Sequence, residues 1–248
     1  MNDSSSEHHE TLDHVKTVVG IHNPAIIHRS QVSKAILGKA DLVIVVGGDG
    51  TFLKTSLFAS GRTLMLGVNS NPKRKEGFFL HCNLENFQKK FHSIMHGDYK
   101  AVKLARLSAK LDGKFLPPSL NEIFVGDARP YKMSYYDLEI GRKKEFQKTS
   151  GLLIAAPAGT HAWAHYAGGK KLNLKMHKYQ VIAREPYIRK IVKQRMLKLT
   201  LLARQKTIIT SHMEHGIVAI DGVSTEFLFA KGSRLEISLT GKSINIVV

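Results

Sequence analysis

The feature that most constrains the fold of this chain is an apolar strand that ends in a glycine turn carrying one carboxylate. The predicted strand is Ala40–Val46, and Gly47-Gly48-Asp49-Gly50-Thr51 follows it directly. Its unbroken apolar character from Leu42 onward predicts a strand buried on both faces, as in an α/β sheet. The alternative is a hairpin turn, because Asp-Gly is also a common hairpin signal. The lack of alternation in the strand favours the α/β interpretation.

The turn itself predicts phosphate chemistry. Glycines let a bulky anionic ligand approach the backbone, and the free amides at the start of the following helix favour phosphate. Open α/β sheets bind their ligands at the carboxyl ends of the strands, which is where Asp49 stands. A carboxylate among phosphates is repelled unless it has a role there. Accepting the proton of an attacking hydroxyl group is such a role.

Composition excludes several classes of protein. The 248 residues suffice for one large domain or two small ones. No apolar run approaches the length that spans a bilayer, and the first residues are too acidic for a transit peptide, so we expect a soluble, cytoplasmic protein. Cys82 is the single cysteine, which excludes an internal disulfide and a cysteine metal cluster.

The net charge of +17 is distributed unevenly. Between Lys170 and Lys206, twelve Lys and Arg residues stand against one acid, Glu185. Such a field attracts polyanions, including nucleotides, polyphosphate and nucleic acid. A solvated basic face is the alternative. The segment lacks the interleaved aromatic residues of a stacking platform, which disfavours single-stranded RNA.

Hydrophobic periodicity predicts two regions of different architecture. Residues 1–98 are expected to form a parallel, Rossmann-like α/β domain that contains the turn. Its predicted elements are helices over 8–19, 31–37 and 83–96 and strands over 40–46 and 63–68. The chain begins within the first helix, so we expect the first strand of such a domain to be missing.

From residue 99 the pattern changes to short alternating segments separated by turns, which predicts a mainly antiparallel β domain over 99–229. Strands over 230–248 are expected to return to the first domain. The predicted strands of this region are 102–111, 120–125, 134–140, 152–155, 179–183, 208–211, 217–220, 234–239 and 243–248.

An adjacent polar pair, Asn121-Glu122, interrupts an apolar β run. Buried polar side chains cost stability unless they are paired, so these two are either exposed or functional. A carboxylate and an amide together suit a ribose diol and an adenine edge. A polar pair on an edge strand is the alternative.

The segment from Ser150 to Gly169 reads as a strand, a Pro/Gly turn and a short helix of small residues. Small residues let a flat ring lie close to the backbone, and Trp163 and Tyr166 could stack on an aromatic base. His161 and His165 have the spacing of a zinc pair but lack the Glu of a zinc helix and a third ligand, so no protein metal site is expected. The basic loop 69–77 is either a phosphate contact or an ordinary solvated loop.

In this order, the motifs resemble the NAD kinase family. The resemblance rests on residues 47–51, 120–122, 157–169 and 220–222 and covers nearly the whole chain. Diacylglycerol and sphingosine kinases share the first motif, whereas the combination is specific. Residues 69–77, 148–151 and 184–186 are most similar to the branch that contains mitochondrial NAD kinases.

The resemblance implies transfer of the γ-phosphoryl group of ATP, or of polyphosphate, to the 2′-hydroxyl of the adenosine ribose of NAD. It implies a homodimer or homotetramer, and Mg²⁺ held mainly by nucleotide phosphates. Asp49 would accept the hydroxyl proton. Residues against phosphate would be Gly48, Gly50, Thr51 and Lys54, and those that bind the dinucleotide would be Asn121, Glu122, Ser150, His161, Ala162, Trp163 and Tyr166.

The chain departs from the family pattern in several respects, among them the missing first strand and Lys170-Lys171, which stand where Gly-Pro is commoner. Ser150 stands where many members have Asp, and His161-Ala162-Trp163 stands where many have Thr-Ala-Tyr. Two other functions remain as alternatives. A lipid kinase would need an apolar pocket, which the polar Asn121-Glu122 pair disfavours. A non-catalytic dinucleotide-binding protein is disfavoured by the retained Asp49. The sequence leaves open ATP or polyphosphate as donor, and NAD or NADH as acceptor.

Overall fold

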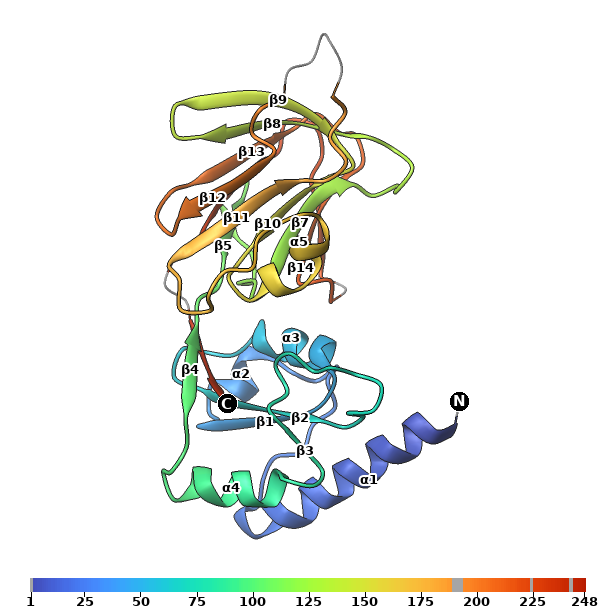
Figure 1. The fold of residues 1–248 in the computed structure, drawn as a ribbon, viewed down its shortest axis with the longest axis vertical. Coiled ribbons are helices and arrows are strands. Elements are labelled where there is room, and N and C mark those ends of the chain that lie inside the picture. The colour runs from blue at the N-terminus through green and yellow to red at the C-terminus, as the bar shows by residue number, and fades with distance from the viewer. Residues whose placement is uncertain (1, 189–193, 224, 241–242) are drawn as a thin grey trace. The chain divides into compact units, whose positions relative to one another are not determined.

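A computed structural model describes residues 2–188, 194–223, 225–240 and 243–248, and it divides into two compact units (Figure 1). Unit 1 comprises Met1–Lys103 and Ser243–Val248, and unit 2 comprises Leu104–Lys242. Of the two strands expected beyond residue 229, β16 (Arg234–Ser238) lies in a sheet of unit 2. The other, β17 (Ile244–Val247), lies in the sheet of unit 1.

Unit 1 is built on a five-stranded sheet in the order β1-β2-β17-β4, with β3 paired to β2. The strands β1, β17 and β3 all pair with β2 in parallel, which confirms the expected α/β class. No strand pairs with the outer edge of β1 among the described residues. The bounds are β1 (Leu42–Gly47), β2 (Leu64–Asn69), β3 (Cys82–Asn83) and β4 (Ala101–Leu104).

Two helices, α1 (Asn2–Val19) and α4 (Phe87–Met95), lie side by side on one face of this sheet (Figure 1). Phe87, Phe91 and Ile94 repeat at helical spacing, so α4 has one apolar face that packs against the sheet. The remaining helices of unit 1 are η1 (Gly20–His22), α2 (Lys34–Leu37) and α3 (Asp49–Ser56).

The predicted helix over 83–96 begins later than expected. Asn83 pairs with Asn69 at the end of β3, so its backbone is extended rather than helical. Its side-chain oxygen accepts the backbone N–H groups of Glu85 (3.1 Å) and Asn86 (3.3 Å). Asn side chains compete in this way with helical hydrogen bonds, and α4 therefore begins at Phe87.

Unit 2 consists of two six-stranded antiparallel sheets, which confirms the expected mainly antiparallel β class. The first has the order β12-β11-β10-β7-β14-β15, with bounds Lys198–Leu202, Lys178–Ala183, Leu152–Ala155, Glu122–Asp127, Gly216–Ile220 and Glu226–Leu228. The second has the order β6-β5-β16-β13-β8-β9. Its strands other than β16 are β6 (Lys114–Phe115), β5 (Ser108–Leu111), β13 (Thr207–Ser211), β8 (Ser134–Ile140) and β9 (Lys143–Thr149).

The first sheet of unit 2 is buried on both faces near β10. Leu152 and Ile154 point into the core between the two sheets. Leu153 and Ala155 point to the opposite face and pack against Ala164 of the helix α5 (Trp163–Tyr166). A strand covered on both faces needs apolar residues at every position, which is why β10 shows no alternation.

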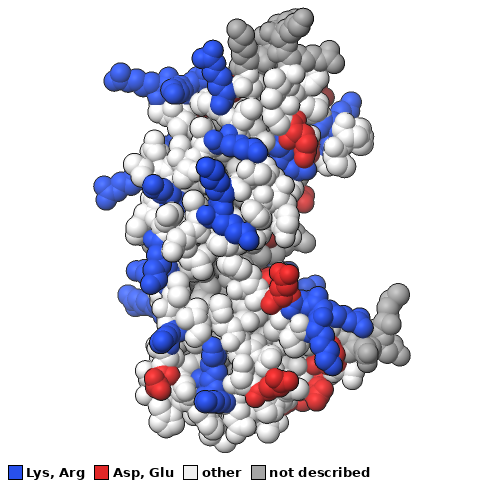
Figure 2. All heavy atoms as spheres, viewed as in Figure 1, with Lys and Arg blue, Asp and Glu red and all other residues white. Residues whose placement is uncertain are grey.

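No helix in the described ranges is both long enough and apolar enough to cross a membrane. On the face seen in Figure 2, blue Lys and Arg side chains lie on each of the two units. Of the basic residues between Lys170 and Lys206, Arg189, Lys190 and Lys193 lie outside the described residues. The other nine are exposed, apart from the half-buried Arg184.

Gly67 in β2 allows a close approach that any side chain would block. A Cβ atom there would lie 2.5 Å from the Phe79 carbonyl oxygen and 2.7 Å from Leu80 Cδ2. We therefore expect Gly67→Ala to lower the free energy of unfolding by roughly 1–3 kcal/mol, the usual cost of overpacking. Urea unfolding measures this loss. Gly20→Ala is the matched control, because no atom lies within 4 Å of its added Cβ. Equal stability of the two variants would contradict the packing argument.

Candidate functional site

The glycine turn links β1 to α3 in unit 1. Gly47 has a φ of 154°, which favours glycine. Gly48 is the N-terminal cap of α3, and its carbonyl accepts the backbone N–H groups of Thr51 (3.0 Å) and Phe52 (3.1 Å). The turn is therefore a strand-to-helix connection, and the hairpin alternative is wrong. It brings Gly48, Asp49, Gly50 and Thr51 together at the end of a parallel strand.

Asp49 is held by the loop that follows β2. Its Oδ2 accepts the Phe78 backbone N–H and its Oδ1 accepts the Phe79 backbone N–H, each at 2.9 Å. The Phe79 ring stacks on Phe52 of α3 at 5.3 Å between ring centroids, which fixes the loop. Asp49 is half-buried. Because a carboxylate oxygen has two lone pairs, each oxygen keeps a further acceptor position after these bonds.

The basic loop 69–77 folds back over the glycine turn. Asn69 Nδ2 donates to the Lys75 carbonyl (2.8 Å), and Asn69 Oδ1 accepts the Asn71 N–H (3.0 Å). The Lys75 side chain lies over Gly48, because a Cβ atom there would be 3.3 Å from Lys75 Cδ. Lys54 stands instead in the last turn of α3. The sequence analysis named the basic loop 69–77 but did not single out Lys75, because nothing in the sequence distinguishes it from the other basic residues of that loop.

In unit 2, Asn121 and Glu122 are buried at the start of β7. This strand pairs with β10 on one side and β14 on the other, so the edge-strand alternative is wrong. Within the described residues, Asn121 Oδ1 and Glu122 Oε2 have no hydrogen-bond partner. Buried polar atoms are nearly always paired, so unpaired polar atoms on two successive residues indicate a place for a polar ligand.

The backbone of this pair is held by Asp221, which follows β14. Its Oδ1 accepts hydrogen bonds from the Ser119 hydroxyl (2.5 Å) and from the backbone N–H groups of Asn121 (2.8 Å) and Glu122 (3.1 Å). Its Oδ2 accepts the Leu120 N–H (2.9 Å). Residues 220–222 entered the sequence analysis only as part of the family resemblance, so this contact was missed.

Burial governs the ionisation of this cluster. It raises the pKa of Glu122 to about 8, and the nearby Asp221 charge acts in the same direction. Burial also raises the pKa of Asp221 to about 6, against the hydrogen bonds that favour its charged form. Arg106 is buried as well, and burial lowers its pKa to about 10 while the attraction of Asp221 opposes the shift. Glu122 can therefore carry a proton near neutral pH.

The turn before α5 lies directly against Asn121. The Ala156 N–H donates to the Asn121 carbonyl (2.8 Å), and a Cβ atom at Gly159 would overlap the same carbonyl. Thr160 Oγ1 accepts the Leu172 N–H (2.9 Å) and fixes the following loop. The structure thus brings Asn121 and Glu122 together with the short η2 helix (Gly159–His161).

Trp163 lies on the surface of α5 and is 39% exposed. One ring contact is with Phe124 of β7, at 5.4 Å between centroids. The guanidinium of Arg184 is 4.8 Å from the Trp163 ring centroid. Trp163 therefore has an aromatic ring stacked on it and a cation over its ring.

The other predicted pocket residues differ in exposure. Tyr166 is 86% exposed, whereas Ala162, His161 and Ser150 are half-buried. His161 Nε2 donates to the Leu172 carbonyl (2.8 Å). The Ser150 N–H donates to the Arg184 carbonyl (2.9 Å), which places Ser150 near the residue that covers Trp163.

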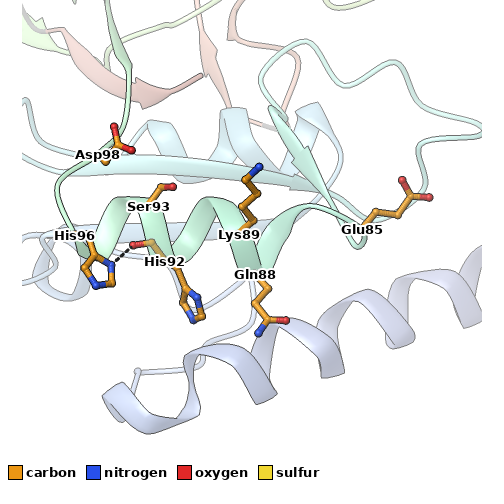
Figure 3. A pocket seen from close by; sticks show the side chains of 7 residues that line it. All are labelled: Glu85, Gln88, Lys89, His92, Ser93, His96 and Asp98. Carbon is orange, nitrogen blue, oxygen red and sulfur yellow. Dashed lines mark hydrogen bonds between the residues drawn. The ribbon is translucent and has the colours of Figure 1, made fainter.

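No group of three or more His, Cys, Asp or Glu side chains in the described part of the chain could hold a metal ion. An open depression of about 610 Å³ is lined by side chains around α4, including Glu85, Lys89, His92 and Asp98 (Figure 3). It contains none of the predicted site residues, and we do not assign the site to it.

Comparisons with known proteins agree with these features. A family model described as the ATP-NAD kinase N-terminal domain matches residues 1–99. The chain is 28% identical to a probable NADH kinase of Oryza sativa subsp. japonica, over 100% of this chain and 83% of the relative. It is also 28% identical to an NADH kinase of Arabidopsis thaliana, over 89% of this chain and 76% of that relative. An NAD kinase from Archaeoglobus fulgidus, solved in complex with ATP, has the same fold, with a TM-score of 0.78. The match covers 96% of this chain and 89% of that chain, at 19% sequence identity.

The raised pKa of Glu122 predicts a pH-dependent stability. Folded Glu122 keeps its proton to about pH 8, whereas an unfolded glutamate loses it near pH 4.5. Between these values the folded state binds more protons, so the free energy of unfolding falls as the pH rises. Glu122→Gln has no carboxyl group that titrates at this position, so this decrease in the free energy of unfolding disappears. We therefore expect the variant to gain on the order of 3 kcal/mol relative to wild type as the pH rises from about 5 to about 8.5.

Urea unfolding of both proteins at the two pH values measures this effect. Glu226→Gln, on the exposed edge of β15, is the matched control because it removes the same charge from the surface. If the two glutamine variants show the same pH dependence of stability, Glu122 does not keep its proton.

Proposed function

Because the chain belongs to the NAD kinase family, we propose that it phosphorylates the 2′-hydroxyl of the adenosine ribose of NAD and produces NADP. The observation that carries the proposal is the Asp49 carboxylate, held by two backbone N–H groups at the carboxyl end of β1. Ligands of open α/β sheets bind at this edge. A carboxylate with free acceptor positions there can take the proton of an attacking hydroxyl.

In this reaction Asp49 accepts the 2′-hydroxyl proton as the ribose oxygen attacks the γ-phosphorus. The two N–H groups that bind Asp49 orient it and leave its remaining lone pairs for the substrate. A general base must first lie within hydrogen-bond reach of the proton that it takes, so a carboxylate with a fixed orientation suits this role. The leaving group is the shortened donor phosphate chain.

The donor phosphates lie against the backbone of Gly48, Gly50 and Thr51 in this proposal. The open space at Gly50 supports this contact, because no protein atom lies within 4 Å of the position that a Cβ atom would take there. Lys75 is close to the turn and supplies a positive charge, and Lys54 supplies another from the end of α3. Mg²⁺ would be held mainly by the phosphates and would neutralise their charge. This fits the side chains present, since Asp49 is the one acid in the turn.

Asn121 and Glu122 bind the adenine edge and the ribose diol. Their unpaired Oδ1 and Oε2 atoms are available for hydrogen bonds with the amino and hydroxyl groups of the substrate. Ser150 binds a hydroxyl of the second nucleoside without the charge of the aspartate that is common in the family. His161, Ala162, Trp163 and Tyr166 line the dinucleotide-binding surface.

The acceptor in this proposal includes NADH, because two relatives that match most of this chain are named NADH kinases. The donor is ATP, with polyphosphate as the second candidate. Exposed basic residues between Lys170 and Lys206 support attraction of either polyanion. We further propose a cytoplasmic homodimer or homotetramer of the branch that contains mitochondrial NAD kinases.

One assay separates this function from its alternatives. Purified protein is incubated with ATP, Mg²⁺ and either NAD or NADH, and the phosphorylated dinucleotide is quantified. A lipid kinase would phosphorylate diacylglycerol but not the dinucleotide. A non-catalytic binding protein would bind NAD without turnover. Replacing ATP by polyphosphate in the same assay identifies the donor.

Asp49→Asn tests the general base. The amide cannot accept the hydroxyl proton, so we expect kcat to fall by about 10²–10⁴-fold while NAD still binds. Steady-state kinetics measures the loss, and circular dichroism checks the fold. Asp41→Asn is the control, because Asp41 is an exposed acid just before β1. Near-normal turnover of Asp49→Asn would remove the proposed role.

Trp163 provides a direct signal for dinucleotide binding because it is the single tryptophan of the chain. We expect its fluorescence to change saturably as NAD is added. Trp163→Ala should weaken NAD binding by about ten- to a hundredfold, since base–aromatic stacking contributes roughly 1–3 kcal/mol. Tyr131→Ala removes another exposed aromatic ring from unit 2 and serves as the control. A silent titration, with unchanged affinity in the alanine variant, would exclude stacking on this residue.

A further inference from the structure

We propose that Asp221 is a positioning residue for the dinucleotide-binding pair, holding Asn121 and Glu122 in the orientation that the substrate needs. The inference rests on the proposed function, because it concerns the same binding side chains. Asp221 does not touch the substrate in this account. It acts through the backbone to which the two side chains are attached.

The first argument is the convergence of donors on one carboxylate. Neighbouring N–H groups of a regular strand point to opposite sides, yet three successive ones, from Leu120 to Glu122, point to Asp221. The β7–β14 ladder ends at the pair Ile123 and Ile220. Beyond that pair the side chain of Asp221 replaces the backbone of β14 as the partner. The backbone at Asn121 and Glu122 is therefore set by this carboxylate rather than by sheet pairing alone.

The second argument is the conformation of Asp221 itself. Its φ is 53°, a left-handed conformation that is unfavourable for a residue with a side chain. Its own N–H donates to the Glu122 carbonyl (2.9 Å), so the contact runs in both directions. The backbone strain persists because the contacts with residues 119–122 hold it. This pattern indicates that the local geometry is built around Asp221.

The third argument is electrostatic. Asp221 and Arg106 are both buried, and their opposite charges attract each other. Burial raises the pKa of Glu122 and keeps its carboxyl group protonated, and the Asp221 charge acts in the same direction. A protonated carboxyl group both donates and accepts hydrogen bonds, which matches a ribose hydroxyl that does the same. Asp221 thus holds the backbone that carries Glu122 and reinforces the protonated state that burial favours.

Asp221→Asn tests the proposal with little change in shape. The amide oxygen still accepts three of the four hydrogen bonds, but the amide nitrogen cannot accept the Leu120 N–H, and the charge is gone. We expect KM for NAD to rise roughly tenfold, as for the loss of one hydrogen bond to a charged group. The change in kcat should stay below about threefold, since Asp49 is untouched.

Glu145→Gln is the matched control. Glu145 also binds backbone N–H groups of another segment, those of Arg195 (2.8 Å) and Met196 (3.1 Å), but lies outside the proposed site. Its amide variant should lose stability without a change in KM. An equal rise of KM in both variants would reduce Asp221 to a general structural role and overturn the proposal.

Titration of the Glu122 carboxyl group by ¹³C NMR gives a readout that is independent of activity. Loss of the Asp221 charge should move this titration to lower pH, whereas Glu145→Gln should leave it in place. If the wild-type protein forms no phosphorylated dinucleotide, the proposed function fails, while the titration still tests Asp221. A folded Asp221→Asn protein with unchanged KM and unchanged titration would overturn the inference.

Ser119→Ala keeps the test decisive if Asp221→Asn does not fold. It removes the Ser119 hydroxyl and leaves the Asp221 charge and its three backbone hydrogen bonds. We expect a rise of KM by roughly threefold, smaller than for Asp221→Asn, with the Glu122 titration nearly unchanged. An unchanged KM in this variant would contradict the positioning role.

Discussion

Backbone N–H groups outside a helix or a sheet ladder need other acceptors, because an unpaired buried N–H group is costly. In this chain, carboxylate side chains meet that need at several places. Asp49 binds two amides of the loop after β2, Asp221 binds three at the start of β7, and Glu145 binds two next to β12. These carboxylates connect segments that are distant in the sequence. Two of these carboxylates, Asp49 and Asp221, hold irregular segments of the candidate site.

The surroundings of the two aspartates separate their roles. Asp49 is half-buried and accepts one hydrogen bond on each oxygen, so it keeps acceptor capacity for a substrate. Asp221 is buried and accepts three bonds on one oxygen alone. One carboxylate is therefore available for chemistry, and the other is committed to structure. The same residue type performs both functions because burial and partner number differ.

Elements with a strong local pattern could be predicted from the sequence, and elements held by tertiary contacts could not. The strand β10 matches its predicted range because all its residues are apolar. The strand β9 was missed because its buried residues, Gln147 and Thr149, are polar, and both bond to the Tyr136 hydroxyl. Likewise, the polar interruption at Asn121-Glu122 is visible in the sequence. The contacts of Lys75 with Gly48 and of Asp221 with residues 119–122 join distant segments and leave no local signal.

The pairing of β17 with β2 makes unit 2 an insertion within unit 1. During synthesis, residues 104–242 leave the ribosome before the strand that completes the parallel sheet. The antiparallel sandwich can therefore fold while the α/β unit still has an open edge on β2. Until β17 arrives, that edge presents unpaired backbone groups to any competing strand. The order of assembly thus runs against the order of the sequence, since the unit that begins first is the last to be closed.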